Sequence, residues 1–437
     1  MKKIKSGSVL VTGLAIVALP AVAADLPSRK AAPVEYVRIC SEHGAGFFYI
    51  PGSDTCLKVA GRVRADFRYE EPFERSANAT RFRGRGYLTL DSRTSTEWGL
   101  LRATTRVKVT KDTGSAASTV LDWAYVQFAG ITAGRLEYSF FDFSPIGDFG
   151  FLDATINGRG SYHEAINALA YTARLAGGFS ATLALEDKSE RVVGVSTYTP
   201  YAPGFGGFAP TTLAEGGQTV PDVVGRLEWT QAWGTAVLAG ALHQNRLGGP
   251  FAPPFNGLAG PAGYVVDTKY GYAINAGLKI NLPMLAAGDN LMLSAVWADG
   301  ASNYTGWTTA GTAGSISPLR ADALLVPGTT DMSLSKSYSL SAGLLHYWTP
   351  TIRQSLYGAY GGLNQQGQYF DVRAVTVGSN VIWSPVRALN IGAEVYYSRL
   401  VGVPVSAYPY VAANDTFYRA GSSPDNWGGR LRFQRDF

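Results

Sequence analysis

Strict alternation of apolar and charged residues is the feature that most constrains this chain. In the clearest segment, one parity is apolar and the other is charged: Leu57, Val59, Val63, Phe67 and Tyr69 against Lys58, Arg62, Arg64, Asp66 and Arg68. Successive side chains of a β-strand point to opposite faces of the sheet. The segment therefore predicts a strand with one apolar face and one charged face, and residues 427–437 predict a second of the same kind.

Sixteen segments can be interpreted as strands, and the connections between them are alternately short and long. The short ones fall near 91–97, 129–131, 175–178, 231–234, 281–289, 348–351 and 384–388. The long ones fall near 70–80, 111–118, 137–164, 187–221, 246–269, 299–336, 362–370 and 399–426. Bacterial outer-membrane barrels have an even number of strands, short periplasmic turns and longer outer loops. We therefore expect an all-β fold, a closed transmembrane antiparallel β-barrel of about 16 strands. Fourteen or eighteen strands are the alternatives, because three segments alternate poorly: 119–128, 166–174 and 352–360.

The physics of lipid favours this barrel over two soluble β-domains. Although 46% of the residues are hydrophobic, no apolar run beyond residue 23 is long enough for a membrane-spanning helix. In lipid every backbone donor needs an acceptor, and only closure removes the unpaired edges of a sheet. Arginine on the lipid face costs roughly 2–4 kcal/mol near the midplane. The side of each strand that carries the charged residues must therefore face a water-filled interior.

The N-terminus predicts export. Lys2, Lys3 and Lys5 precede an apolar run over residues 9–19, and Ala21-Val22-Ala23 supplies the small residues of a cleavage site. The run is too short to favour an uncleaved anchor. We expect a signal peptide over residues 1–23 and one barrel domain over 24–437. The three lysines account for three units of the formal charge of +5, which leaves about +2 and indicates no nucleic-acid partner.

Three stretches resemble the alphaproteobacterial porin family of the Rhizobiales. They are the Cys-flanked opening EYVRICSEHGAGFFYIPGSDTCLKVAGRVR (35–64), AYVQFAGITAG (124–134) and the end RFQRDF (432–437). The resemblance implies a sixteen-stranded, homotrimeric general porin of the Gram-negative outer membrane, whose third outer loop folds inward. Residues 137–164 occupy that position. Its expected partners are outer-membrane lipid, lipopolysaccharide and the barrel assembly machinery.

The terminal Phe437 is expected to be the signal that the assembly machinery recognises, since outer-membrane barrels resemble one another in ending on an aromatic residue. Arg435, at the outward position two residues earlier, departs from that pattern. A charge near the rim of a barrel is tolerated.

The pore lining is the predicted functional feature. Four neighbouring strands are expected to bring one basic arc together: Arg62, Arg64, Arg68, Arg81, Arg83, Arg85, Arg102, Arg106, Lys108, Arg430 and Arg432. The inward loop is expected to face it with Asp142, Asp148 and Asp153, between Glu137 and Glu164. Such an arrangement sets a field across the pore and tunes which solutes pass. We expect a weak anion preference, although the arginines could also serve to hold the loop through its acids.

Cys40 and Cys56 are the only cysteines. An even count in an exported chain indicates a disulfide, with two free thiols or half a metal site as alternatives. No metal or cofactor is expected. A disulfide closing this loop is expected to contribute roughly 3 kcal/mol.

A general diffusion channel for ions and small hydrophilic solutes is the function that we expect. A substrate-specific sugar or anion channel is the nearest alternative. In a sugar channel, Phe140, Phe141, Phe143, Phe149 and Phe151 could stack on the solute, but packing against the wall is the favoured role for most of them. A surface adhesin is the third alternative, because the outer loops are long. An enzyme is not indicated, since the histidines are isolated and no nucleophile elbow or zinc motif occurs.

Overall fold

The computed structural model describes residues 38–72, 78–143, 165–200, 208–251, 264–307, 320–326, 328–365, 371–401 and 425–437. The chain divides into two units, Met1–Arg38 and Ile39–Phe437. The predicted signal peptide, residues 1–23, lies outside the described residues. Among the helices in the described ranges, none combines the length and the apolar character needed to cross a membrane.

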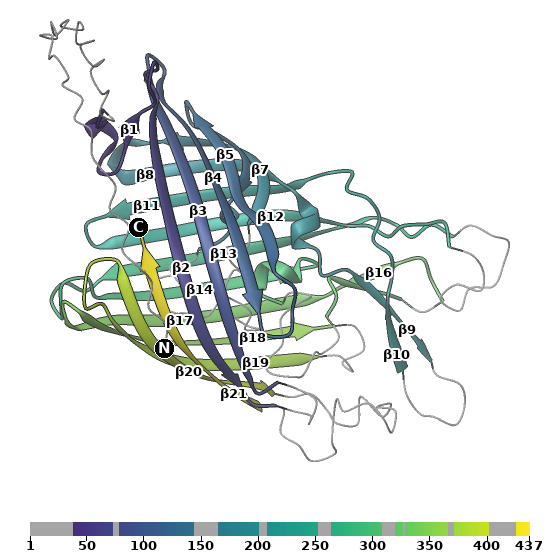
Figure 1. Cartoon of the computed structure of the whole chain (residues 1–437). Helices are drawn as coiled ribbons and strands as arrows, with labels where there is room; N and C mark the ends of the chain where they lie inside the picture. The colour runs from purple at the N-terminus through teal and green to yellow at the C-terminus, as the bar shows by residue number, and fades with distance from the viewer. Residues whose placement is uncertain are drawn as a thin grey trace, which may run out of the picture. The chain divides into compact units, whose positions relative to one another are not determined.

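Sixteen antiparallel strands form a closed barrel. Each pairs with the next along the chain, and the last pairs with the first through contacts such as Phe67↔Leu431. In Figure 1 the yellow β21 lies beside the dark β2. The predicted closed barrel of sixteen strands is therefore confirmed. The strands are β2 (Cys56–Glu70), β3 (Thr80–Thr96), β4 (Gly99–Asp112), β5 (Ser118–Phe128), β6 (Ile131–Leu136), β7 (Ile166–Arg174), β8 (Phe179–Glu186), β11 (Asp222–Gln231), β12 (Gly234–Asn245), β13 (Lys269–Asn281), β14 (Asn290–Asp299), β17 (Lys336–Thr349), β18 (Ile352–Asn364), β19 (Val372–Trp383), β20 (Leu389–Val401) and β21 (Asp425–Asp436).

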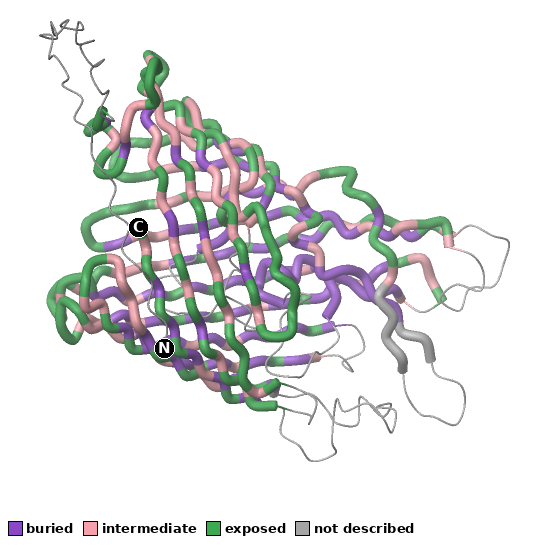
Figure 2. The backbone as a smooth tube through the Cα atoms, in the orientation of Figure 1, coloured by how far each residue is buried: buried purple, intermediate pink, exposed green. Residues whose placement is uncertain are grey.

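Burial alternates along the strands as the sequence predicts. On β2, Val63 is 55% exposed on the outer face, whereas Asp66 on the inner face is 2% exposed. Figure 2 shows this alternation along many barrel strands. Aromatic side chains gather at both ends of the outer face, as in Phe179–Trp229 near the short turns and Tyr272–Trp297 near the long loops. Such belts mark the two interfaces of a membrane.

The first short connection differs from its prediction. A link was expected near 91–97, but β3 continues to Thr96 and the turn consists of Glu97 and Trp98. Asp91 and Arg93 keep pairing with Thr104 and Arg102 on β4. A polar run can continue the strand because the inner face is itself polar.

The longest outer loops contain a second sheet, which the sequence did not predict. Loops 187–221 and 299–336 supply β9 (Val195–Pro200), β10 (Phe208–Thr212), β15 (Ala323–Leu325) and β16 (Met332–Leu334). β9 and β15 pair in parallel, which joins the two loops. A small apolar core that includes Val195, Leu325 and Met332 lies against this sheet. Alternation could not reveal these strands because they are too short to show a period.

The buried Asp322 links the same loops. Its carboxylate accepts hydrogen bonds from the backbone N–H groups of Val193, Gly194 and Ser302. Short 3₁₀ turns flank this contact, η3 (Lys188–Arg191) and η4 (Ser302–Thr305), and η2 (Ala176–Gly178) forms a turn at the opposite end of the barrel.

The N-terminal segment of the second unit forms a disulfide-closed loop. It contains η1 (Ser41–His43) and the two-residue strand β1 (Phe48–Tyr49), which pairs with the beginning of β2. Cys40 and Cys56 are joined by an S–S bond of 2.00 Å and are fully buried. The predicted disulfide is confirmed. The thiolates that a metal site would need are therefore consumed, although Glu42 and His43 lie close by.

Candidate pore lining

The inner faces of β2, β3, β4 and β21 carry all eleven predicted basic residues, which we call the basic wall. Because neighbouring strands are in register, these side chains lie in rows across the wall. Arg64 lies directly opposite Arg85, and Arg68 lies opposite both Arg81 and Arg430. Like charges directly opposite each other destabilise a sheet. The rows therefore require compensating carboxylates.

Carboxylates on the same strands supply that compensation. Asp66 accepts a bidentate pair of hydrogen bonds from Arg432, at 2.6 and 2.9 Å, and its side chain is fully buried. Asp112 accepts a similar pair from Arg83, at 2.6 and 2.7 Å. Bidentate Arg–carboxylate pairs fix geometry as well as neutralising charge. The wall is thus held rigid by its own ion pairs.

Other members of the basic wall share their carboxylates. Arg102 shares Asp91 with Arg93, a further cation of β3 outside the eleven, and Arg106 and Lys108 both lie against Asp122. Arg62 bonds Asp436 at 2.5 Å, and Arg81 lies 3.6 Å from Glu70. The eleven cations of the wall thus face six carboxylates on these strands and β5: Asp66, Glu70, Asp91, Asp112, Asp122 and Asp436. A net positive charge remains.

Three guanidinium groups converge on the Tyr87 ring. The guanidinium carbons of Arg106, Arg64 and Arg62 lie 4.0, 5.4 and 6.0 Å from its centroid. Arg106 also lies 4.2 Å from the Trp123 ring. Stacking over an aromatic face is attractive for a guanidinium through the ring quadrupole. These contacts orient the cations without neutralising them.

A different inner surface lies on β14, β17, β18 and β19. It carries six buried hydroxyl side chains, which we call the hydroxyl wall: Ser294, Ser337, Ser339, Ser341, Ser355 and Thr376. The inner faces of β14, β17 and β19 carry no charged residue, and β18 carries only Arg353 near its short turn. The excess of cations in the described lumen therefore lies on the basic wall, whereas the charged residues on the inner faces of β8 and β11 are mostly acidic: Glu186, Asp222, Arg226 and Glu228.

The start of the predicted inward loop packs on the inner face of the barrel. The Phe141 carbonyl accepts a hydrogen bond from Asn275 on β13, and its ring meets Tyr304 edge to face at 4.6 Å. The Phe143 ring covers Gly277, where an added Cβ would lie 2.1 Å from it. Both phenylalanines are buried, so they pack against the wall. Residues 144–164, including Asp148, Asp153, Phe149 and Phe151, lie outside the described residues.

Asp142 was expected to line the pore, but the structure places it elsewhere. Its side chain is fully buried and pairs with the equally buried Arg191 at 2.6 Å. The carboxylate is shielded from solvent, and its charge is neutralised. The physical reason is that a loop base lying against the wall buries its polar groups, and a buried charge persists only when it is paired.

Residues that the sequence analysis missed hold this loop base. Arg226 on β11 donates to the carbonyls of Phe140 and Asp142, and Glu186 on β8 accepts from the Phe140 N–H. The inward parity of Arg226 and Glu186 was visible in the sequence, but their partner in the loop was not. Arg191 lies in a long loop without any periodic signal.

Glu137 begins the predicted inward loop, directly after β6, and interacts electrostatically with Arg106 and Arg62 of the basic wall. Its side chain is exposed, yet partial desolvation of its carboxyl raises its pKa above the usual value. The nearby Arg106 and Arg62 oppose that shift in pKa, whereas Asp122 adds to it. Glu137 thus offers a titratable negative charge beside the cations.

Phe437 extends the closure of the barrel. Its backbone N–H and carbonyl both bond to Gly61 of β2, at 3.0 and 2.9 Å. Its ring lies over Gly61, where a Cβ would come within 2.2 Å of it, and stays 68% exposed on the outer face. A glycine is therefore required beneath the ring. The role of Phe437 in assembly stays a prediction.

Comparison with known proteins places this geometry in a family. The porin subfamily profile matches residues 25–422. Porin Omp2b of Brucella abortus and of Brucella melitensis is 30% identical over 247 residues, which cover 53% of this chain and 62% of those relatives.

Two solved structures share the fold. They are the outer-membrane channel DcaP of Acinetobacter baumannii (TM-score 0.60, 14% identity, 89% of this chain and 99% of that one) and an anion-selective porin from Comamonas acidovorans (TM-score 0.51, 12% identity, 88% of this chain and 100% of that one). Since the family profile spans most of the sequence and the barrel closes with sixteen strands, the chain belongs to the porin subfamily of the outer membrane.

Proposed function

We propose that the chain forms a water-filled channel for passive diffusion of ions and small hydrophilic solutes, with a weak preference for anions. The observation that carries the proposal is the uneven charge of the lumen. The basic wall holds more cations than carboxylates, and the hydroxyl wall is uncharged. Charge on one side of a low-dielectric pore produces a transverse field that raises the local concentration of counter-ions.

Selectivity follows from the fixed side chains of the lining and requires no conformational change. Arg62, Arg64 and Arg106 are held in place by ion pairs, hydrogen bonds and the Tyr87 ring, so a passing anion meets donors that are already oriented. Fixed donors lose little conformational entropy when a solute approaches. Passage then depends on size and charge, with no gating ligand, metal or energy source.

Several partners and features belong to the same proposal. We propose that the chain assembles as a homotrimer, that the barrel assembly machinery recognises Phe437, and that lipid and lipopolysaccharide surround the barrel. We also propose that the whole of loop 137–164 folds inward to narrow the pore. The buried contacts of Phe141 and Phe143 support that last statement. The signal peptide over 1–23 and the barrel domain over 24–437 complete the proposal.

Single-channel recording of the refolded chain in a planar bilayer tests the proposal. Stepwise ohmic openings grouped in threes are expected, and a salt gradient is expected to give a reversal potential on the anion side. Cation preference would contradict the charge argument. A folded, inserted barrel without conductance would overturn the channel itself and favour an adhesin.

A substrate-specific anion channel is the second candidate. The convergence of Arg62, Arg64 and Arg106 on Tyr87 favours it, because several oriented donors can bind one carboxylate or phosphate. Conductance that saturates with one organic anion, and that this anion blocks at low concentration, would distinguish it from general diffusion.

A further inference from the structure

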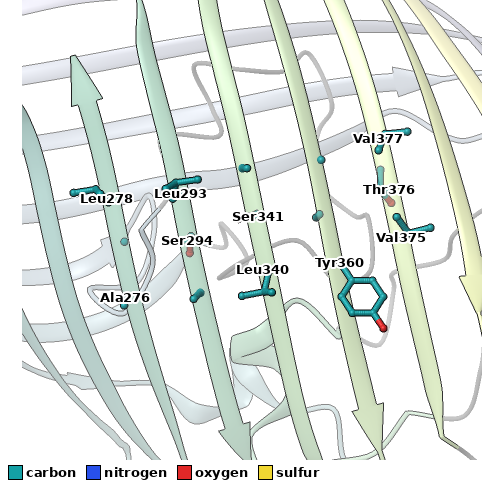
Figure 3. A pocket seen from close by; sticks show the side chains of 15 residues that line it. Ala276, Leu278, Leu293, Ser294, Leu340, Ser341, Tyr360, Val375, Thr376 and Val377 are labelled. Carbon is teal, nitrogen blue, oxygen red and sulfur yellow. The ribbon is translucent and has the colours of Figure 1, made fainter. Parts of the chain in front are cut away.

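The outer face of the barrel carries an apolar groove over β13, β14, β17, β18 and β19. Its volume is about 630 Å³. Figure 3 shows the strands that line it, with the labelled side chains of Leu293, Leu340 and Val377 among them. The outward-facing residues at the middle of the groove are small: Ala276, Ala295, Ala342 and Gly358. Leu293, Leu340 and Val377 in its lining are exposed on the outer face, so the groove faces the membrane.

Two outward-facing arginines lie next to the groove at its long-loop end. Arg373, Val375 and Val377 follow one another on the outer face of β19, so Arg373 lies directly beyond two residues that line the groove. On β20, Arg399 pairs with Val375 and is the diagonal neighbour of Arg373. Diagonal neighbours on one face lie within reach of long side chains. Both arginines are exposed.

These arginines differ from those of the lumen. The lumen arginines bond carboxylates on their own wall, whereas no ion pair joins Arg373 or Arg399 to a described side chain. Arg399 lies opposite Asp425, whose side chain is outside the described residues. Arginine on the outer face of a barrel is tolerated near the interface and costly deeper in the lipid. Their position therefore suits the headgroup level of the outer leaflet.

Two tyrosines lie level with the arginines at the long-loop end of the groove. Tyr338 and Tyr360 are outward neighbours on β17 and β18, with ring centroids 6.0 Å apart. The Tyr338 ring covers Gly362, which pairs with Arg373 on its other side. Tyrosine prefers the depth where headgroups meet acyl chains. Cations and tyrosine rings thus lie together at one end of the apolar groove, which suits a phosphorylated sugar whose acyl chains continue into the groove.

We infer that this surface binds lipopolysaccharide, with a lipid phosphate on Arg373 and Arg399 and acyl chains in the groove. The charge complementarity and the position at the long-loop end select this lipid, because lipopolysaccharide forms the outer leaflet and carries several acyl chains on a phosphorylated sugar. Phospholipid offers the same phosphate but occupies the opposite leaflet. The inference rests on the proposal that lipopolysaccharide surrounds the barrel, but it does not depend on which solutes pass through the pore.

Binding of purified lipopolysaccharide to the refolded chain in detergent, followed by native mass spectrometry, tests the inference. The double variant Arg373→Gln/Arg399→Gln is expected to bind at least about tenfold more weakly, since each cation near an anionic lipid contributes on the order of 1 kcal/mol. Dephosphorylated lipopolysaccharide is expected to bind the unaltered chain with a similar loss. Ala342→Leu, which fills the groove, is expected to weaken both ligands.

Matched variants elsewhere on the outer face are the controls. Arg435→Gln removes an exposed outward arginine at the opposite rim, and Ala103→Leu enlarges an exposed outward alanine on β4. Both are expected to keep unaltered affinity. Unchanged binding by the double variant, or equal competition by phosphatidylglycerol, would overturn the inference. Conductance of the same samples is expected to be unaltered, so loss of channel activity and loss of lipid binding are separate outcomes.

Discussion

The basic wall and the hydroxyl wall are inner faces of the same barrel, but their side chains differ in charge and in size. Both lie on inner faces, with side chains of one parity directed into the barrel. On the basic wall, long cations are spaced by carboxylates and held by bidentate pairs such as Arg83–Asp112. On the hydroxyl wall, short side chains such as Ser339 and Ser355 are fully buried. One wall therefore presents charge, and the other allows close packing.

The difference shows how a rigid pore can carry an electric field across its width. Charges spread evenly around the lumen would cancel one another's transverse field, whereas charges on one wall add to it. The cost is repulsion among neighbouring arginines, which the six interleaved carboxylates offset. Field and stability therefore depend on the same residues.

The largest expected effect comes from breaking the most buried pair of the basic wall. Asp66→Ala leaves Arg432, itself 2% exposed, without its bidentate partner. Removing one member of a buried pair typically costs about 3–5 kcal/mol. A matched loss in the free energy of unfolding is expected in a denaturant titration. Asp436→Asn, at a partly exposed pair, is the control and is expected to cost less than about 1 kcal/mol.

Removing charge without breaking the barrel tests the field directly. The triple variant Arg62→Gln, Arg64→Gln, Arg106→Gln is expected to shift the reversal potential in a salt gradient toward the cation side. Ser341→Ala, Ser355→Ala and Thr376→Ala on the hydroxyl wall provide a control that changes no charge. An equal shift in both sets of variants would show that the charges of the basic wall do not set selectivity.

Titration of Glu137 is expected to change the anion preference that the basic wall produces. Because desolvation raises the pKa of its carboxyl, Glu137 takes up a proton at a higher pH than a free glutamate does. As the pH falls from neutral, a negative charge beside Arg106 is lost, so anion preference is expected to increase. Reversal potentials measured across this range should change less in Glu137→Gln. The same pH dependence in that variant would assign the effect to another group.

The smallest expected effect is that of a single hydroxyl. Ser339→Ala removes one buried hydroxyl of the hydroxyl wall and leaves the volume almost unchanged. We expect a change of about 1 kcal/mol or less in the free energy of unfolding, because no described group hydrogen-bonds this hydroxyl and its removal therefore breaks no hydrogen bond. An unaltered conductance is expected as well. A large change in conductance would show that this wall also contacts solutes.

Much of the fold was predictable because the lipid imposes a local rule. Val63 and Arg64 had to face opposite sides whatever their distant partners were, and the same parity placed Arg432 inside. Asp142 was misplaced because its environment depends on Arg191, 49 residues away. No period in the sequence connects these two loop residues.

The sequence alone determined which side of the clearly alternating strands is wet, that the chain closes into a barrel, and that Cys40 and Cys56 are the only residues able to form a disulfide. Those properties depend on parity, length and residue type, which are local. Tertiary structure decided that loops 187–221 and 299–336 share a sheet, that Asp322 joins them, and that Arg373 lies beside an apolar groove. These contacts depend on register between strands and on loops meeting in space, which sequence spacing does not encode.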